Sequence, residues 1–555
     1  MYWVYNDRMI PLDDLVTQTA TGWEWHIPPR FNIARACVRQ HIERGHGSDT
    51  ALVVEDDVLG TSQLSYAELD TASGRFVSAL AELGVHPGER VLIRLPNSID
   101  FPVSFFGCLK FGAVAVPTST LLSAPEVTYL AQDSGARVLV THKSMWPQLS
   151  RGIAGQTQLD FVLLAGSGEM AADSPTTGAQ LIDLQALLHS SPANDFIIDS
   201  SPDDPAYLVY TSGTTGFPKG VLHGHRSLLG RQPSSHFWFD FKPGDRIIHS
   251  GKFNWTYVLG TGLMDPLFHG HTVIVYEGQS DAGIWPQLIS KHRCTVFIGV
   301  PTLYRQILQK TGFCGADVPT LRHCMSAGEH LSDEMLFQWR ERFDMDIYEA
   351  IGMSEFSYYI SQNRQRPIRP GAAGFIQPGH EVALLDENYQ PVQAGAEGML
   401  AVRDTDPGLF LGYWELPQET AKSYREGYFL TGDYARVDED GYIWFVGRRD
   451  DIINTFGYRV SPHEVERVMK THPAVADCVA LGEPSGRDKI LVSACIILHP
   501  GASADAQEIL DFGQRNLARY KAPRLVHFLR DFPRTKNGKV LRKQMLADLA
   551  GDQTV

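Results

Sequence analysis

The sequence lacks the cysteine spacing that a metal or redox site needs. Its seven cysteines are scattered along 555 residues, and no two of them form a Cys-x-x-Cys pair. Zinc and dithiol sites therefore have no support from the cysteines. Scattered thiols are typical of a reducing compartment, so we expect a cytoplasmic protein.

Long apolar segments are also missing. No uninterrupted apolar run is long enough to span a bilayer. The opening residues, MYWVYNDRMIPLDD, include acidic side chains and no apolar core of a signal peptide. The final residues, DQTV, are not a peroxisomal signal. We expect a protein without a membrane span.

An excess of positive charge is absent too. The 49 Lys and Arg residues and 64 Asp and Glu residues give a formal charge of −15, which argues against a nucleic-acid partner. Residues 519–543 differ, because they contain nine basic residues and one acid, Asp531. By itself this segment predicts either a solvated basic face or a segment that approaches polyphosphate.

The length and the hydrophobic pattern indicate at least two domains. Apolar strands alternate with helical patterns over residues 65–140 and again over 271–310. Such alternation predicts parallel sheets in layered α/β subdomains. We place a boundary at 448–451, which gives a large N-terminal domain, 1–449, and a small mobile α+β domain, 450–555. In the small domain we expect helices over 461–470 and 505–518 and strands near 475–481 and 490–498.

A glycine- and hydroxyl-rich loop follows the apolar strand 207–210. Glycines let backbone N–H groups approach an anion, consecutive N–H groups form an anion-binding nest, and a lysine adds a point charge. The order of residues differs from the Walker P-loop, since Gly220 follows the lysine. The loop predicts a phosphate site formed by Thr211, Ser212, Gly213, Thr214, Thr215, Gly216 and Lys219.

The stretch TSGTTGFPKG resembles the signature of the adenylate-forming (AMP-binding) superfamily. Four further stretches resemble the family's motifs in the family's order, so the resemblance covers nearly the whole chain. Within the family, the acyl-CoA synthetase branch is the most similar, and in particular the medium-chain and benzoate-type acid–CoA ligases. The resemblance implies that ATP, Mg²⁺ and coenzyme A take part in the reaction.

Two motifs carry implied nucleotide contacts. In the stretch Met325–Glu329, the family's turn lines the adenine pocket, which assigns Gly328 and Glu329 to the nucleotide. The stretch Tyr348–Glu355 resembles the family's Tyr-Gly-x-Thr-Glu motif, with departures at two positions. Ile351 replaces the aromatic residue that stacks on adenine, and we consider Tyr348 as its substitute. Gly352 and Ser354 complete the nucleotide contacts, and Glu355 offers the oxygen ligand that Mg²⁺ prefers.

The remaining motifs lie near the C-terminus. Asp433, in a Thr-Gly-Asp motif, is suited to accept hydrogen bonds from ribose hydroxyls. The resemblance implies that Arg448 contacts ribose or phosphate and that Asp450 is the hinge of the small domain. It further implies that Gly457, Tyr458 and Arg459 bind coenzyme A. The residues implied to be catalytic are Lys539, Thr211, Lys219 and Glu355.

The acyl pocket is predicted from a segment rich in aromatic residues. Gly352 stands where acetate-type synthetases carry a tryptophan, so we expect an open pocket there. Ordinary core packing remains an alternative for Phe253 and Trp255. An apolar pocket would favour a medium-chain, aromatic or alicyclic acid. We assign to it Phe253, Asn254, Trp255, Val300, Ala327 and Gly352.

These observations predict an ATP-dependent acyl-CoA synthetase. The acid would form an acyl-adenylate with release of pyrophosphate, and the acyl group would then pass to the thiol with release of AMP. One alternative is an acyl-AMP ligase that loads a carrier protein in trans. A non-catalytic nucleotide-binding regulator would be expected to lack Lys539, Asp433 or Glu355, and all three are present. Whether the chain forms a homodimer stays open.

Overall fold

The chain divides into two compact units. Unit 1 contains Met1–Pro370, Gly374–Glu381 and Asp404–Tyr424, and unit 2 contains Gly371–Ala373, Val382–Arg403 and Arg425–Val555. The computed structural model describes residues 12–552, except 21, 154, 156, 169–177, 212–217, 280, 329–330, 449–450, 456–457, 486–489, 518, 520 and 535–539.

Unit 1 contains a first sheet whose central strands are parallel, as the alternating pattern predicts. At one edge of the sheet, β11 pairs antiparallel with β10, and β21 pairs antiparallel with β11. In sheet order the strands are β21 (Gly412–Tyr413), β11 (Lys219–Gly224), β10 (Pro205–Thr211), β6 (Val114–Pro117), β5 (Arg90–Arg94), β7 (Val138–His142), β8 (Phe161–Ala165) and β9 (Gln180–Asp183).

Two helices between these strands match the predicted helical segments. Helix α3 (Tyr66–Glu82) begins with a capping box, in which Ser65 and Glu68 each accept the other's backbone N–H. Such a cap contributes about 1 kcal/mol. Helix α4 (Asp100–Phe111) packs closely on α3, because a Cβ at Gly107 would lie 2.7 Å from the ring of Phe76.

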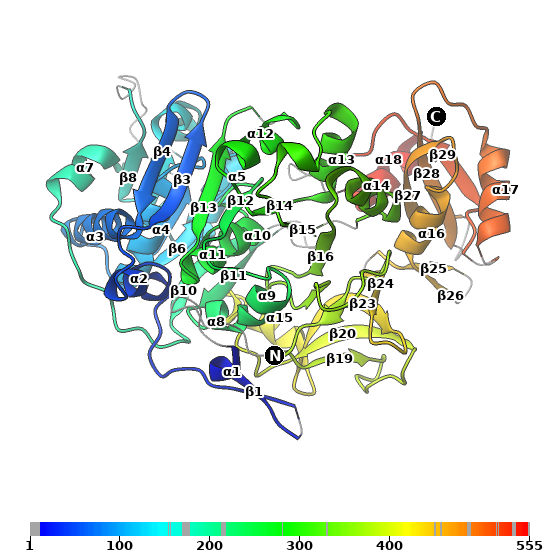
Figure 1. Ribbon diagram of the computed structural model, residues 1–555, viewed down its shortest axis with the longest axis horizontal. Helices are drawn as coiled ribbons and strands as arrows, with labels where there is room; N and C mark the ends of the chain where they lie inside the picture. Colours follow the sequence, from blue (N-terminus) through cyan, green and yellow to red (C-terminus); the bar gives the residue numbers. More distant parts are fainter. Residues whose placement is uncertain are drawn as a thin grey trace. The chain divides into compact units, whose positions relative to one another are not determined.

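The second sheet of unit 1 is parallel from β3 to β16. Its central strands consist mostly of apolar residues because both faces are covered. In Figure 1, β3, β13, β12, β14 and β15 follow one another across the unit. The strands in sheet order are β18 (Phe375–Ile376), β17 (Ile360–Ser361), β16 (Ile347–Ile351), β15 (His323–Ala327), β14 (Val296–Gly299), β12 (Arg246–His249), β13 (Thr272–Glu277), β3 (Thr50–Asp56) and β4 (Gly60–Ser65).

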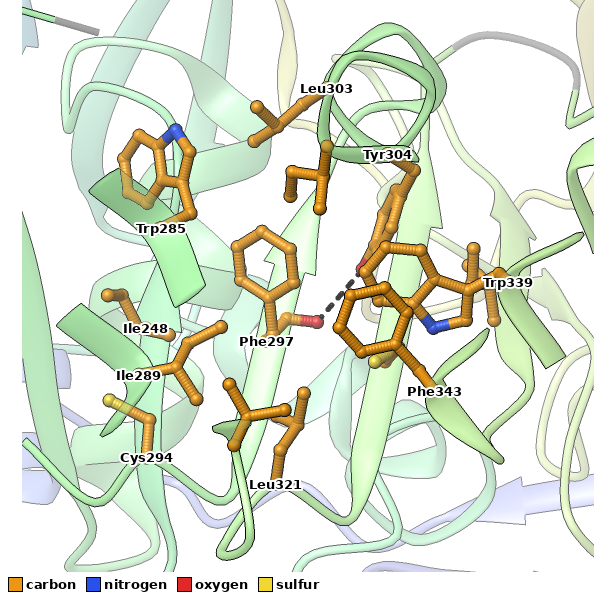
Figure 2. Packing of buried hydrophobic residues seen from close by; sticks show 14 of the residues in the cluster. Ile248, Trp285, Ile289, Cys294, Phe297, Leu303, Tyr304, Leu321, Trp339 and Phe343 are labelled. Carbon is orange, nitrogen blue, oxygen red and sulfur yellow. Dashed lines mark hydrogen bonds between the residues drawn. The ribbon is translucent and has the colours of Figure 1, made fainter. Parts of the chain in front are cut away.

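An aromatic core covers one face of this second sheet (Figure 2). Trp339 stacks on Phe343 with ring centroids 3.9 Å apart, and the Tyr304 hydroxyl donates to the Met325 carbonyl at 2.8 Å. Burial of each such side chain contributes roughly 1.5–3 kcal/mol. The core is built from helices α12 (Ile284–Lys291), α13 (Pro301–Lys310) and α14 (Asp333–Phe343).

Unit 2 combines an antiparallel sheet with a smaller α+β layer. The predicted helices over 461–470 and 505–518 and the predicted strands near 475–481 and 490–498 are present. The predicted boundary at 449–450 falls inside unit 2, on residues outside the described part, so it stays a prediction. The elements are β19 (Val382–Leu385), β20 (Glu397–Arg403), β23 (Tyr428–Val437), β24 (Ile443–Arg448), α16 (Pro462–Met469), β27 (Val475–Pro484), β28 (Ile490–Leu498), α17 (Ala506–Asn516), β29 (Leu525–Phe528) and α18 (Arg542–Asp552).

Among the described residues, none of the helices combines the length and the apolar character that crossing a bilayer would require.

Candidate active site

The two ends of the predicted phosphate loop are held side by side. Thr211 is the last residue of β10 and pairs directly with Lys219, the first residue of β11. The Tyr129 hydroxyl donates to the Pro218 carbonyl at 3.0 Å and so fixes the end of the loop. The predicted contacts at 212–216 lie outside the described residues.

The ammonium group of Lys219 contacts two side chains of the same unit, and a third side chain contacts one of these. The ammonium group forms an ion pair with Glu419, on helix α15 (Pro417–Lys422), at 2.9 Å. It also lies 5.3 Å from the centre of the Tyr413 ring. The Tyr413 hydroxyl donates to Glu355 Oε1 at 2.8 Å. Burial and the nearby Glu355 carboxylate raise the pKa of Tyr413, which keeps the phenol protonated as a donor.

Two residues predicted at the phosphates, Ser354 and Glu355, follow β16 and are anchored through their backbone. His223 of β11 donates from Nε2 to the Ser354 carbonyl at 2.8 Å, and the Phe410 N–H donates to the Glu355 carbonyl at 2.9 Å. Burial lowers the pKa of His223 to about 3, so the ring is neutral and carries its proton on Nε2. The structure therefore brings Lys219, Ser354 and Glu355 to one place.

A chain of buried polar side chains continues from His223; we call it the buried relay. It consists of His223, Tyr207, Arg231, Asp265 and Tyr358. The His223 ring stacks on Tyr207 at 4.7 Å, and Arg231 donates to the Tyr207 hydroxyl at 3.2 Å. Arg231 forms an ion pair with Asp265 at 3.0 Å, and the Tyr358 hydroxyl donates to the same carboxylate. The relay thus holds both ends of the segment 354–358.

Sequence reasoning missed the relay and also missed Tyr413 and Glu419. One signal was available for the relay, because Asp265 interrupts the apolar stretch GLMDPLF and a buried charge needs a partner. No local pattern marks Glu419 as the partner of Lys219, which lies 200 residues earlier in the chain.

Gly328 and Trp255 come together at the end of β15. Gly328 has a φ of +92°, a left-handed conformation that favours glycine. A Cβ at this position would lie 3.6 Å from the Trp255 ring. Ala327 ends β15 directly before it. A predicted nucleotide residue and two predicted acyl-pocket residues are therefore neighbours, whereas Glu329 lies outside the described residues.

The other residues of the predicted adenine contact lie on or next to β16. Tyr348 is 7% exposed and its ring stacks on His323 with centroids 4.7 Å apart. One face of the Tyr348 ring is therefore occupied by His323. Ile351, the last residue of β16, is half-buried, and its carbonyl accepts from the Tyr359 N–H at 3.1 Å. The contact with adenine stays a prediction for both residues.

The structure explains the glycine at position 352 by close packing of the main chain, whereas the sequence predicted an open acyl pocket there. A Cβ there would lie 2.2 Å from the backbone nitrogen of Tyr358. The space beside Gly352 is therefore filled by main chain, and the expected open volume does not lie in that direction. The glycine allows the segment 353–358 to fold back onto β16.

The remaining acyl-pocket residues divide into two groups. Phe253 is 1% exposed and its ring stacks on Phe101 at 5.2 Å, as core packing predicts. Trp255 is half-buried and meets the Tyr257 ring edge-on at 5.3 Å. Asn254 and Val300 are half-buried, and Val300 packs against the aromatic core of Figure 2.

In unit 2, the Thr-Gly-Asp motif forms a bulge in β23. Ala401 pairs with Leu430 and Met399 pairs with Tyr434, so residues 431–433 stand opposite one residue, Leu400. The Thr431 hydroxyl donates to the Leu400 carbonyl at 2.8 Å and accepts from the Asp433 N–H at 3.1 Å.

The bulge also fixes the neighbours of the predicted ribose acid. Gly432 has a φ of +77°, which the bulge requires. Arg448 of β24 pairs with Asp433 in the strand register, and its Nε lies 3.5 Å from the Asp433 carboxylate. Two residues predicted at the ribose are therefore adjacent within this unit.

Several predicted residues fall where the structure gives no description. Lys539, Asp450 and Gly457 lie outside the described residues, and for Tyr458 and Arg459 only the backbone is described. These two residues belong to strand β26 (Tyr458–Val460), which pairs with β25 (Ile453–Thr455). Their predicted roles stay predictions.

The described residues offer no complete set of protein ligands for a metal ion. They contain no group of three or more His, Cys, Asp or Glu side chains that could hold one. A single carboxylate such as Glu355 suits Mg²⁺, which binds proteins through one or two carboxylates and takes its other ligands from phosphates and water.

Known proteins are similar to this chain in both sequence and structure. A family model described as AMP-binding enzyme matches residues 39–414, and one described as AMP-binding enzyme C-terminal domain matches 464–539. The 3-hydroxybenzoate–CoA/4-hydroxybenzoate–CoA ligase of Thauera aromatica is 33% identical over 524 residues, which are 94% of this chain and 97% of that protein.

Two solved structures are similar over almost their full length. The anthranilate CoA ligase AuaEII in complex with anthranoyl-AMP superposes with a TM-score of 0.84 at 30% identity, covering 95% of this chain and 99% of that one. The ATP-bound MatB of Rhodopseudomonas palustris gives 0.83 at 27% identity, covering 94% and 100%. The chain belongs to the AMP-binding enzyme family, in its acyl-CoA synthetase branch.

Proposed function

We propose that this chain is an aromatic acid–CoA ligase. It would convert a benzoate-type acid, ATP and coenzyme A into the acyl-CoA thioester, AMP and pyrophosphate. The likeness to a hydroxybenzoate–CoA ligase over 94% of the chain carries the proposal. The Trp255 ring beside Gly328 supports it, because an aromatic side chain next to the nucleotide loop suits a flat apolar acid.

In the first step, an oxygen of the acid attacks the α-phosphorus of ATP. The bond from this phosphorus to the bridging oxygen breaks, and pyrophosphate leaves. Catalysis of such a step is mainly positioning and stabilisation of charge on the phosphoryl oxygens. In our proposal Lys219 and the Thr211–Lys219 loop bind the phosphates, and Asp433 binds the ribose. Lys539 binds the developing charge, as the family resemblance implies.

Glu355 is the residue that we propose for Mg²⁺. Tyr413 fixes one carboxylate oxygen, and within the described part of the chain no hydrogen bond engages the other. A half-occupied carboxylate on an anchored backbone fits a cation that takes its remaining ligands from phosphates and water. When bound, Mg²⁺ would supply positive charge at the phosphates.

In the second step, the sulfur of coenzyme A attacks the acyl carbonyl carbon. The thiol proton is lost to solvent, the bond from the carbonyl to the phosphate oxygen breaks, and AMP leaves. We propose Gly457, Tyr458 and Arg459 for the coenzyme and Asp450 as the hinge. These four roles rest on the family resemblance alone.

A substrate panel tests the proposal. The purified chain is incubated with ATP, Mg²⁺, coenzyme A and one acid at a time: benzoate, its hydroxy and amino derivatives, cyclohexanecarboxylate, hexanoate and acetate. We expect pyrophosphate and AMP release to be about tenfold or more faster with a benzoate than with acetate. A preference for acetate would contradict the acid, and no release with any acid would contradict the activity. Pyrophosphate release without consumption of coenzyme A would favour the carrier-protein alternative.

A further inference from the structure

Lys219 has an anionic partner within its own unit. Its Nζ lies 2.9 Å from Glu419 Oε2, and the other oxygen of this carboxylate lies 2.7 Å from Lys422 Nζ. Lys422 and Lys219 together lower the pKa of Glu419 to about 2, so the carboxylate is ionised at neutral pH. The single cation at the described edge of the phosphate loop is therefore engaged by the chain itself.

The placement of Glu419 is built into the fold. Strand β21 pairs with β11, and the Trp414 N–H donates to the Gly220 carbonyl at 2.8 Å. The Tyr413 N–H donates to the Thr420 hydroxyl at 2.9 Å, which folds α15 back over β21. A Cβ at Gly412 would lie 3.2 Å from Thr420, so the two segments are in close contact. Glu419 is thereby carried to the first residue of β11.

We propose that Glu419 is the internal counter-ion of Lys219 in the nucleotide-free enzyme and yields Lys219 to the phosphates of ATP. The inference rests on the proposed function, because it assigns Lys219 to the phosphates. Glu419 is a positioning residue in this scheme and does not touch the reacting atoms.

Lys219 could either leave Glu419 for the phosphates of ATP or contact both at once, and the charge of Glu419 favours the first. A lysine has three N–H donors, so its geometry would allow carboxylate and phosphate to bind together. A carboxylate a few ångströms from a polyphosphate would, however, repel it and weaken binding. Lys422 offers Glu419 a second cation at 2.7 Å, so the carboxylate keeps a partner when Lys219 leaves it.

The test is the equilibrium affinity of the full chain for ATP, measured by calorimetry without acid substrate. Glu419→Gln removes the competing charge and keeps the shape, so we expect the Kd for ATP to fall about two- to fivefold, the size of a partly exposed ion pair. Pyrophosphate should respond in the same way. The Kd for AMP should change less, because AMP lacks the two leaving phosphates.

Two further variants isolate the pair. In a Lys219→Met background, Glu419→Gln should lower the Kd for ATP by less than it does in the wild-type chain, because the competition for Lys219 has been removed and only the repulsion between Glu419 and the phosphates remains. Glu415→Gln removes one exposed acid from the same connection and is the matched control, with no change expected. The thermal midpoint of each variant verifies its fold.

Each outcome has one meaning. Tighter ATP binding by Glu419→Gln that is reduced in the Lys219→Met background supports the inference, and an equal gain in both backgrounds overturns it. Unchanged or weaker binding overturns it, and weaker binding would mean that Glu419 keeps Lys219 in place while ATP is bound. If the wild-type chain turns over benzoates while Glu419→Gln has no effect, only the inference fails. If the wild-type chain neither binds ATP nor turns over any acid, the proposed function itself fails.

Discussion

Gly352 lies where a strand turns sharply back on itself. The backbone nitrogen of Tyr358 occupies the place that a side chain at Gly352 would take. Three residues after Gly352 comes Glu355, the residue proposed for Mg²⁺. The glycine therefore fixes the path of the main chain between 352 and 358, which includes Glu355.

A single methyl group tests this role. Gly352→Ala places a Cβ 2.2 Å from the Tyr358 nitrogen, so the main chain must move, at a cost of about 1–3 kcal/mol for overpacking. We expect a lower thermal midpoint and a large loss of acid-dependent pyrophosphate release. Gly312→Ala is the control, since a Cβ there would meet nothing within 4 Å. Equal activity of the two variants would refute the packing role.

At the scale of elements, the buried relay links the first sheet of unit 1 to the segment after β16. His223 and Tyr207 come from β11 and β10. Arg231 lies between the short helices α8 (Ser227–Gly230) and α9 (Gln232–Phe237), and Asp265 begins α11 (Asp265–Phe268). A buried ion pair contributes little net stability, but loss of one partner is costly because the other charge stays buried. The relay therefore favours one position of the segment 354–358 over others.

His223 is the position at which the relay can be tested without breaking the ion pair. His223→Leu removes the donor and leaves the partly buried Ser354 carbonyl without it, at a cost of about 1 kcal/mol. We expect slower pyrophosphate release, while thioester formation from a supplied acyl-adenylate falls less. His223→Gln, which keeps an N–H donor, should restore part of the first rate. An equal loss in both half-reactions would point to a general loss of structure.

Those helices and strands that could be predicted from the sequence have local signals. The pattern around 65–84 contains its own cap at Ser65 and Glu68, and α3 forms within those bounds. Periodicity also predicted the strand before Thr211 and the helix over 461–470. The partners of Lys219 and Ser354 could not be predicted, because they depend on contacts between residues more than 100 positions apart. The same limit explains why Gly352 was expected to open a pocket.

At the scale of the whole molecule, buried histidines set a limit on acid stability. Burial lowers the pKa of His223, His249 and His323 to about 3. An unfolded histidine has a pKa of about 6.5. Between these values the unfolded chain binds more protons than the folded one, so this contribution is complete above pH 6.5 and is lost as the pH falls below it.

We therefore expect the urea midpoint of unit 1 to fall steeply between pH 6.5 and 5. For each of the three histidines the slope approaches about 1.4 kcal/mol per pH unit as the pH falls well below 6.5. His249→Gln removes one titrating group, so the dependence of the unfolding free energy on pH should lose the slope of one histidine. The substitution also lowers stability at pH 7. Urea titrations followed by tryptophan fluorescence measure both effects. A midpoint that is constant from pH 7 to 5 would contradict the neutral burial of these rings.

The bulge at 431–433 has a consequence for how its acid can be changed. Residues 431–433 of β23 stand opposite the single residue Leu400 of β20, so β23 has two extra residues. Because two is an even number, the side chains of β23 alternate between the same two faces on both sides of the bulge. Leu430 and Tyr434 accordingly pack in the same apolar cluster. Deletion of a single residue from the bulge would reverse the inward and outward alternation on one side of it. The two extra residues therefore bring Asp433 into the strand while the flanking residues keep their faces.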